Sequence, residues 1–327
     1  MPKFKPKKVF VASLLAVFSM FFLQIGFPIG EAWSNGGPSY PGWVQYGTHD
    51  LIADSAYYRV LEVDPDAVKY LAEDLWDYRY ATEIPDFKLQ DWVNHNYDFH
   101  KYGYKGGPPD RGAPSKVQEL YDETVELLSN WITEGMPVGS QNAKEARKSM
   151  GMVSHYFADI CMPLHTDDTS DGSPEHTHTT LKFPDGSIKK KSYHSLYESS
   201  IDYGVKQRII DLYSIPKVRR PTYISDPYTL TLEYAKLSNG IYVVPATDPE
   251  HCLVGNRYWW FVEEIEGCVD HEKTFNGLPG MSPELYRETM VQLQYASEGF
   301  ADILYSVWQD AEEQAEYQIV EPYPLAS

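Results

Sequence analysis

Apolar residues recur three and four positions apart over five long stretches of the chain, at 46–63, 117–132, 143–161, 192–213 and 284–314. This spacing places the apolar side chains on one face of a helix, which can then pack against other helices. Strict alternation of apolar and polar residues, the pattern of a half-buried strand, is not sustained anywhere at comparable length. The pattern therefore predicts a mainly α fold, built as a single helical domain.

Capping residues and a proline indicate where two of these helices begin and end. Ser115 with Gln118, and Asn142 with Glu145, fit the capping box that bonds free N–H groups at a helix start. Pro163 cannot continue a helix, so the stretch at 143–161 should end or bend there. Two consecutive helices are expected, beginning near 115 and 142.

Other segments lack a helical period. Residues 82–114 are rich in Pro, Gly, Asn and Asp and predict a long ordered loop, a kind of loop that often carries function. Asp-Gly at 185–186 predicts a hairpin turn, and Ser-Pro at 282–283 predicts the start of the last helix. Residues 214–280 form an unassigned insertion, because Tyr, Pro and Gly are frequent there and no period is sustained.

The beginning of the chain differs in composition from the rest. Four lysines precede an apolar run at 9–23, and the small residues Gly30 and Ala32 come just before Trp33. This arrangement predicts a secretory signal over 1–32, with cleavage between Ala32 and Trp33 and a secreted mature protein. The alternative is an uncleaved N-terminal membrane anchor over 9–30, although three residues weaken such a span: Gln24, Gly26 and Pro28.

The charge balance is strongly acidic. The chain has a formal net charge of −19, and removal of 1–32 would take away four lysines and Glu31, leaving 24 basic against 46 acidic side chains, a net of −22. A field of this sign repels polyanions at long range. The net charge therefore counts mildly against nucleic acid as a partner, although the local charge of a metal site can override it.

The three cysteines give a limited prediction. An exported protein can form disulfides, and Cys252 and Cys268 lie in the same region and could pair. Cys161 has no evident partner. No CxxC spacing is present, so a cysteine-based zinc site is not expected.

The residues with the clearest chemistry lie between 154 and 198. His155 and Asp159 are four positions apart on one predicted helix, and His194 and Glu198 repeat this spacing on another. Side chains four apart on a helix converge on one point, as zinc ligands must. A single such pair is more often a hydrogen-bonded contact in a core. Two pairs, with His165 between them, favour a metal site.

The order H-x3-D-x5-H followed by H-x3-E resembles the zinc-dependent phospholipase C family, which shares its fold with the single-strand-specific zinc nucleases. The wording HYFADICMPLH and YHSLYE is similar to the family's two helical motifs. The resemblance implies a helical-bundle domain over 33–327 with long ordered loops. Residues 214–280 have no counterpart in it.

Carried over residue by residue, the resemblance implies three zinc ions. Trp33 would bind through its free amino group and carbonyl, and Asp159 would bridge two ions. The implied ligand sets are Asp86, His95, His155 and Asp159 for the first ion; Trp33, His49 and Asp159 for the second; and His165, His194 and Glu198 for the third.

Some positions of this assignment stay open. Asp91 could replace Asp86 and His100 could replace His95, because the loop has no helical register that fixes the choice. His176 and His178 lie in a segment that is longer than is usual for the family. They are interpreted as solvated loop residues, with an accessory metal site as the alternative.

The implied activity is hydrolysis of a phosphodiester, most directly that of a phospholipid head group, with transient contact to a membrane surface. Zinc ions activate a bound water and stabilise the charge of the phosphoryl group, and Asp86 could accept the proton of that water. A nuclease or nucleotidase on the same scaffold is the alternative enzyme. Glu198, where the nucleases more often have Asp, and the absence of a basic groove favour the lipase. A third hypothesis is an exported protein that zinc only stabilises.

Overall fold

The structure is a computed structural model that describes residues 46–99, 112–166, 179–240 and 257–320. The chain divides into two units, 1–30 and 31–327, and every described residue belongs to the second. The predicted signal segment and Trp33 thus lie outside the described residues. The elements, in chain order, are α2 (Thr48–Leu61), η1 (Asp66–Val68), α3 (Lys69–Ala72), α4 (Leu75–Ala81), η2 (Pro85–Leu89), η3 (Trp92–Asn94), α6 (Ala113–Thr133), α7 (Gln141–Ile160), η4 (Pro163–Thr166), β1 (Thr179–Lys182), β2 (Ile188–Lys191), α8 (Tyr193–Lys206), α9 (Pro227–Asn239), α10 (Arg257–Asp270), β3 (Thr274–Phe275), β4 (Leu278–Pro279) and α11 (Pro283–Val320).

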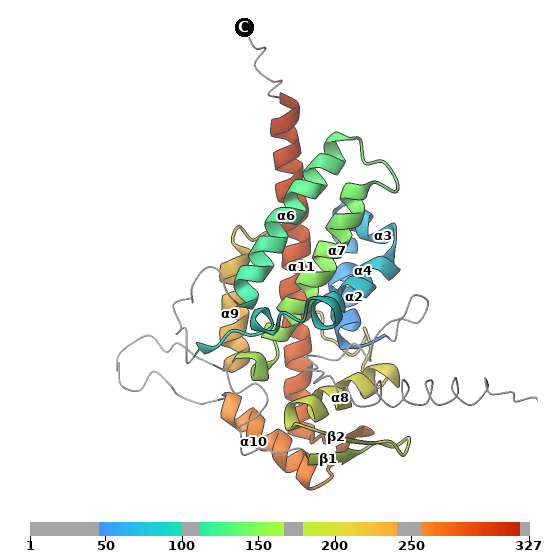
Figure 1. The fold of residues 1–327 in the computed structure, drawn as a ribbon, viewed down its shortest axis with the longest axis vertical. Coiled ribbons are helices and arrows are strands. Elements are labelled where there is room, and N and C mark those ends of the chain that lie inside the picture. Colours follow the sequence, from blue (N-terminus) through green and yellow to red (C-terminus); the bar gives the residue numbers. More distant parts are fainter. Residues whose placement is uncertain (1–45, 100–111, 167–178, 241–256, 321–327) are drawn as a thin grey trace, which may run out of the picture. The chain divides into compact units, whose positions relative to one another are not determined.

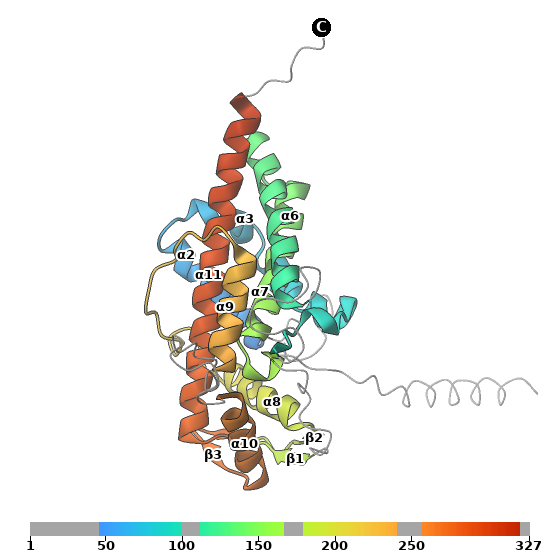
Figure 2. The same ribbon diagram turned by 90° about the vertical axis from the view of Figure 1, so that its left-hand side faces the viewer.

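The fold is mainly α, as the sequence pattern predicts. Helices α6 and α7 form a hairpin and pack against each other along their length (Figure 1). The 38-residue helix α11 lies against both α6 and α2, and α9 covers α6 beside it (Figure 2). Helix α7 is buried on most of its surface, so its side chains are held in the middle of the bundle.

Both predicted capping boxes are wrong, because the helices begin earlier than the sequence suggested. Helix α6 begins at Ala113 after Gly112, which has a φ of 82° that suits glycine. A Cβ on Gly112 would lie 2.9 Å from the carbonyl oxygen of Asn96. Helix α7 is capped by Ser140, whose Oγ accepts a hydrogen bond from the backbone N–H of Asn142. Proline and small polar residues at the helix starts thus decide the boundaries.

The predicted loop at 82–114 contains more structure than its composition indicated. Its first part forms a π-helical turn, η2, and a 3-10 turn, η3. Gln90, with a left-handed φ of 53°, ends η2. Residues 100–111 lie outside the described residues.

The hairpin and the last helix start are confirmed. Strands β1 and β2 pair antiparallel, and Gly186 takes a φ of 85° in the turn between them.

Helix α8 ends at Lys206, earlier than the predicted 213, because Arg208 takes a left-handed φ of 56°. Ser282 caps α11 by accepting a hydrogen bond from the N–H of Leu285. The unassigned segment 214–280 supplies α9, α10 and the short strands β3 and β4.

Two cysteines belong to the described residues. Cys161 is buried where α7 ends and acts as a small apolar side chain of the core, which accounts for its position beside polar neighbours. Cys268 is also buried, and its thiol donates to Glu264. Its pairing with Cys252 stays a prediction, because Cys252 lies outside the described residues.

None of the helices over 46–99, 112–166, 179–240 and 257–320 is both long and apolar enough to span a bilayer.

A close approach between α7 and α4 fixes the position of α7. A Cβ on Gly151 would lie 2.5 Å from the Cβ of Ala81 and 2.6 Å from the carbonyl oxygen of Tyr78. Contacts this short cannot form without movement of the backbone of α4. Gly151 lies one helical turn before His155, so the close packing also sets the depth at which that histidine lies.

Substitution Gly151→Ala should therefore lower the free energy of unfolding by about 1 to 3 kcal/mol, the usual cost of overpacking a core. Urea denaturation at a fixed zinc concentration measures it. The matched control is Gly267→Ala in α10, where a Cβ would meet nothing within 4 Å. That variant should be unchanged or slightly more stable, because alanine favours a helix. Equal losses in both variants would show that the contact with α4 has no special role.

Candidate metal centre

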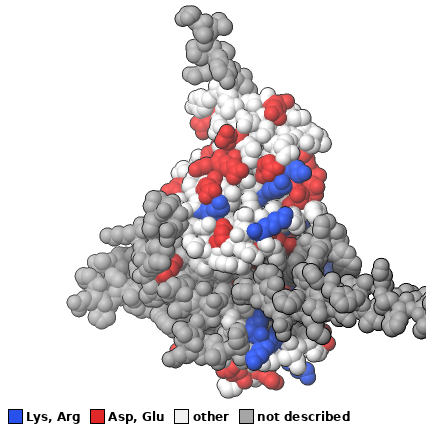
Figure 3. Space-filling model, viewed as in Figure 1, with Lys and Arg blue, Asp and Glu red and all other residues white. Residues whose placement is uncertain are grey.

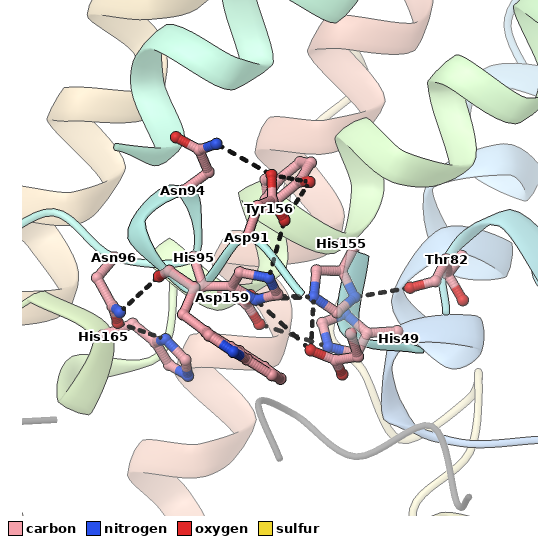
Figure 4. Close-up of polar contacts among 12 residues, drawn as sticks. His49, Thr82, Asp91, Asn94, His95, Asn96, His155, Tyr156, Asp159 and His165 are labelled. Carbon is pink, nitrogen blue, oxygen red and sulfur yellow. Dashed lines mark hydrogen bonds and ion pairs between the residues drawn. The ribbon is translucent and has the colours of Figure 1, made fainter. Parts of the chain in front are cut away.

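Residues from four elements meet around the carboxylate of Asp159 on α7. Oδ2 of Asp159 lies 2.8 Å from Nδ1 of His95 and 3.2 Å from Nε2 of His155. Oδ1 of Asp86, on η2, lies 3.6 Å from each of the same two nitrogens. Ligands of a tetrahedral zinc ion are roughly 3.3 Å apart, given bonds of about 2.0 Å. The four atoms are therefore spaced as the ligands of one ion would be; Figure 4 shows three of the residues, His95, His155 and Asp159.

The second oxygen of Asp159 faces another histidine. Oδ1 lies 3.4 Å from Nε2 of His49, which comes from the first turn of α2. The rings of His49 and His155 stack with their centres 4.0 Å apart. All three residues are fully buried. Asp159 thus has one oxygen directed to each of two neighbouring positions, which is the geometry of a bridging carboxylate.

A third group lies where η4 meets the start of α8. Nε2 of His165 is 3.5 Å from Oε1 of Glu198, and Nε2 of His194 is 2.8 Å from the same oxygen. His194 and Glu198 are one turn apart on α8, so the helix presents both to His165. Ligand-type atoms come within 4.8 Å of one another in three sets: His49, His155 and Asp159; Asp86, His95 and His155; and His165, His194 and Glu198.

Hydrogen bonds to the remaining ring nitrogens orient two of the histidines. Nδ1 of His155 donates to the carbonyl oxygen of Thr82 at 2.6 Å, and Nδ1 of His165 donates to Oδ1 of Asn96 at 2.8 Å. In both rings the proton then sits on Nδ1, and the lone pair of Nε2 faces the group. Such orienting partners are typical of histidines that bind metals.

Asp91 has an outer position. Its carboxylate accepts hydrogen bonds from the hydroxyl of Tyr156 and from Nδ2 of Asn94, and it lies 3.5 Å from Nε2 of His95 (Figure 4). Asp86, in contrast, faces the two histidines on their inner side. The geometry brings Asp86 into the first ligand set and leaves Asp91 as the partner behind His95.

Burial and neighbouring charges prepare two of these groups for ligation. Burial lowers the pKa of His49 well below its ordinary value, and the nearby His155 adds to this effect. Burial would raise the pKa of Asp159, but His155 and His165 lower it well below the ordinary value. The imidazole is therefore neutral and the carboxylate ionised near pH 7, the forms in which both side chains bind metals.

The pKa values of Asp86 and His95 are both raised above their ordinary values. Burial raises the pKa of Asp86 to about 7. Burial alone would lower the pKa of His95, but its hydrogen bond with Asp159 and the nearby carboxylates of Asp91 and Asp86 raise it to about 10. The pocket thus favours a positive charge at its centre, which a proton supplies to the free protein and a metal ion would supply in its place.

Unpaired atoms test whether a metal fits. Among the described residues, several buried ligand-type atoms have no hydrogen-bond partner: Nδ1 and Nε2 of His49, Oδ1 of Asp86, Nε2 of His95, Oδ1 of Asp159, Nε2 of His165 and Oε2 of Glu198. Leaving so many polar atoms unpaired in one buried region is costly. Imidazole nitrogens and carboxylate oxygens are the ligands that zinc accepts, so these residues fit zinc ions.

Eight of the nine residues predicted from the sequence lie in these groups: His49, Asp86, His95, His155, Asp159, His165, His194 and Glu198. The ninth, Trp33, and the residues His100, His176 and His178 lie outside the described residues. Sequence reasoning missed the orienting roles of Thr82, Asn96 and Tyr156. Nothing in their spacing marks them, because each acts on a residue distant in sequence.

The sequence matches the profile of a family described as zinc dependent phospholipase C over residues 48–241. No curated protein matches the chain. Among solved structures, the chain is similar to an alpha toxin from Clostridium absonum and to the alpha-toxin of an avian strain of Clostridium perfringens, each with 16% identity and a TM-score of 0.47. The matches cover 81% and 82% of this chain, which spans 64% of the length of each toxin.

The family profile matches more than half of the chain and includes all three groups of residues that could hold a metal ion. The resemblance inferred from the HYFADICMPLH and YHSLYE motifs is thereby confirmed. This chain belongs to the zinc-dependent phospholipase C family.

Proposed function

We propose that this protein is a zinc-dependent phosphoric diester hydrolase that cleaves phospholipid head groups, a phospholipase C. The observation that carries the proposal is the bridging geometry of Asp159, with one oxygen in each of two adjacent ligand sets and a third set nearby. Clustered metal ions of this kind are typical of enzymes that cleave phosphate esters.

The metal assignment follows the three groups. Asp86, His95, His155 and Asp159 would hold the first zinc ion; His49, Asp159 and the amine and carbonyl of Trp33 the second; and His165, His194 and Glu198 the third. The third group offers three ligands among the described residues. An open fourth position is characteristic of a catalytic zinc site and not of a structural one.

The residues have separate tasks in the proposed reaction. Bound zinc ions would lower the pKa of a bound water and offset the negative charge of the phosphoryl oxygens. Asp86 would take the proton from the attacking water, because its carboxylate faces the two histidines of the first group. Thr82 and Asn96 would keep the lone pairs of His155 and His165 directed inward.

The charge of the chain favours a phospholipid over a nucleic acid. A net charge of −19 repels a polyanion at a distance, whereas a zwitterionic head group is not repelled. A nuclease or nucleotidase, and a protein that zinc only stabilises, are the outcomes against which the proposal is tested.

We also propose that the protein is exported, with cleavage between Ala32 and Trp33. The support is the order of lysines, apolar run and small residues at 3–32. Cleavage at this bond would create the free amine that the second zinc ion needs. Retention of 9–30 as a membrane anchor is the alternative.

An assay panel on zinc-loaded protein that begins at Trp33 tests the function. Phosphatidylcholine and other phospholipids, a chromogenic phosphodiester and single-stranded DNA are offered separately. The proposal requires release of the phosphorylated head group from a lipid. Cleavage of DNA alone would establish the nuclease, and zinc-loaded protein inert on every substrate would establish a structural role.

Substitution His194→Gln should remove the zinc of the third group, because the amide is a poor substitute for an imidazole ligand. We expect about one zinc ion fewer per chain and a fall in phosphodiesterase activity of about 100-fold or more. Elemental analysis of the folded variant measures the metal. The matched control is His271→Gln, an exposed histidine outside the three groups. If both variants retained the same zinc content, His194 would not be a ligand.

Removal of zinc should destabilise the protein, because the buried carboxylates and imidazoles would lose the ions that pair with them. Treatment with a chelator should lower Tm by roughly 5 to 10 °C, as expected for a ligand present at about a thousand times its Kd. Thermal melts before chelation, after it, and after return of zinc measure the change. An unchanged Tm would contradict the ligation of zinc inside the bundle.

One residue added before Trp33 should lower zinc content and activity, since the second ion would lose the amine that we assign to it. The control is a Trp33→Phe protein with its amino terminus unchanged, which keeps the amine and the carbonyl. Metal analysis of both proteins separates the two effects. Equal zinc content in the extended and parent proteins would rule out a role for the amine.

A further inference from the structure

A short segment between two metal-ligand residues exposes apolar side chains. Leu89, Trp92 and Val93, here called the apolar segment, are 48%, 38% and 63% exposed. The ends of this stretch are fixed, because Asp86 and His95 are both buried in the first group. The indole of Trp92 also contacts the ring of His95, with ring centres 5.3 Å apart. The exposed residues are therefore held against the metal centre and cannot retreat into the core.

The β1–β2 hairpin exposes a second set of side chains. Lys182 and Lys190 are exposed, and Ile188, which pairs with Lys182 in the strand register, is 65% exposed. Leu181 and Phe183 on the opposite face are buried. The outward face of the hairpin thus combines two lysines with an exposed isoleucine. Strand β2 ends just before α8, which carries His194 and Glu198, so the hairpin is joined directly to the helix of the third group.

The two sets face the same side of the bundle. Figure 2 shows the η2–η3 region and the β1–β2 hairpin projecting together from one side, away from α11. Residues 179–191 of the hairpin contain four lysines and one acidic residue, Asp185. Figure 3 shows Lys and Arg side chains at this level and also in the upper half of the same face, where Asp and Glu cover more of the surface. In a chain with a net charge of −19, this local excess of lysine is unusual.

Aliphatic side chains, a tryptophan and lysines on one face are the composition of surfaces that bind the membrane interface. Leu and Val side chains enter the acyl region, indole rings settle at the level of the head groups, and lysines pair with lipid phosphates. A binding site for a soluble protein partner would not need to adjoin two metal-ligand groups. A membrane whose lipids are the substrate would.

We propose that the apolar segment and the outward face of the β1–β2 hairpin form a docking surface for a phospholipid bilayer that contains anionic lipids. This inference rests on the proposed phospholipase C function, because it brings the metal groups to face the lipid that they would cleave. The apolar segment supplies the affinity for any bilayer, and the two lysines supply the preference for an anionic one.

Binding of the full chain to vesicles provides the first test. The variants are Leu89→Ser with Val93→Ser, and Lys182→Glu with Lys190→Glu. The matched controls are Val138→Ser and Lys144→Glu, exposed residues at the turn and start of α7, on another part of the bundle. Co-sedimentation is measured with phosphatidylcholine vesicles and with vesicles of equal parts phosphatidylcholine and phosphatidylglycerol.

The apolar variant should bind both kinds of vesicle about tenfold more weakly. The charge variant should lose about tenfold on the anionic vesicles and little on the neutral ones. Both controls should bind as the parent does. Retention of full vesicle binding by both variants would overturn the proposal.

A local probe removes any contribution of residues 1–32 to membrane binding. An environment-sensitive fluorophore on Val93→Cys should shift to the blue when anionic vesicles are added, whereas the same fluorophore on Val138→Cys should not. Labelled parent protein reports the background from the native cysteines. Identical shifts at both positions would overturn the proposed orientation.

Cleavage of a soluble chromogenic phosphodiester separates this inference from the proposed function. Cleavage of the soluble phosphodiester without a fluorescence shift at position 93 would refute the docking surface and leave the proposed hydrolase activity standing. A shift at position 93 in a protein that cleaves no phosphodiester would support the docking surface and refute the hydrolase.

Discussion

The buried negative charge of Asp159 is the constraint on which the centre depends. Its side chain has no exposure, yet His155 and His165 keep its pKa low, so it remains ionised inside the bundle. An isolated charge at this depth would cost several kcal/mol. The neighbouring imidazoles offset this cost, and in the proposed holoprotein the metal ions would offset it further.

The helical bundle supplies the rigidity that such a centre requires. Helix α7 passes through the middle of the bundle and is held close to α4 by Gly151, so His155 and Asp159 have little freedom to move. His49, His194 and Glu198 also lie on helices. Asp86, His95 and His165 come from short turns, which alone would be less well placed. Backbone contacts fix these turns: the carbonyl oxygen of Thr82 bonds His155, and the N–H of Tyr97 donates to the carbonyl oxygen of His165.

The helices and the two helical ligand pairs could be predicted from the sequence, because both follow from a period that the chain carries locally. The starts of α6 and α7 could not, since Gly112 and Ser140 precede these helices in place of the predicted capping-box residues. The sequence also could not show whether Asp86 or Asp91 belongs to the first group. It depends on the hydroxyl of Tyr156, a residue of another element, which holds the carboxylate of Asp91 away from the inner side of His95. Irregular segments have no period that could reveal such a contact.

The distribution of the ligands along the chain has a consequence for folding. Several contacts of the centre join residues far apart in the sequence, such as His155 with His95 at 60 positions and His155 with Thr82 at 73. Each contact closes a long loop, and the entropy lost in closing several loops is recovered only when all of them are closed together. The complete centre is thus a late product of folding. Its occupancy distinguishes a finished bundle from a compact intermediate that has formed its helices and not yet joined them.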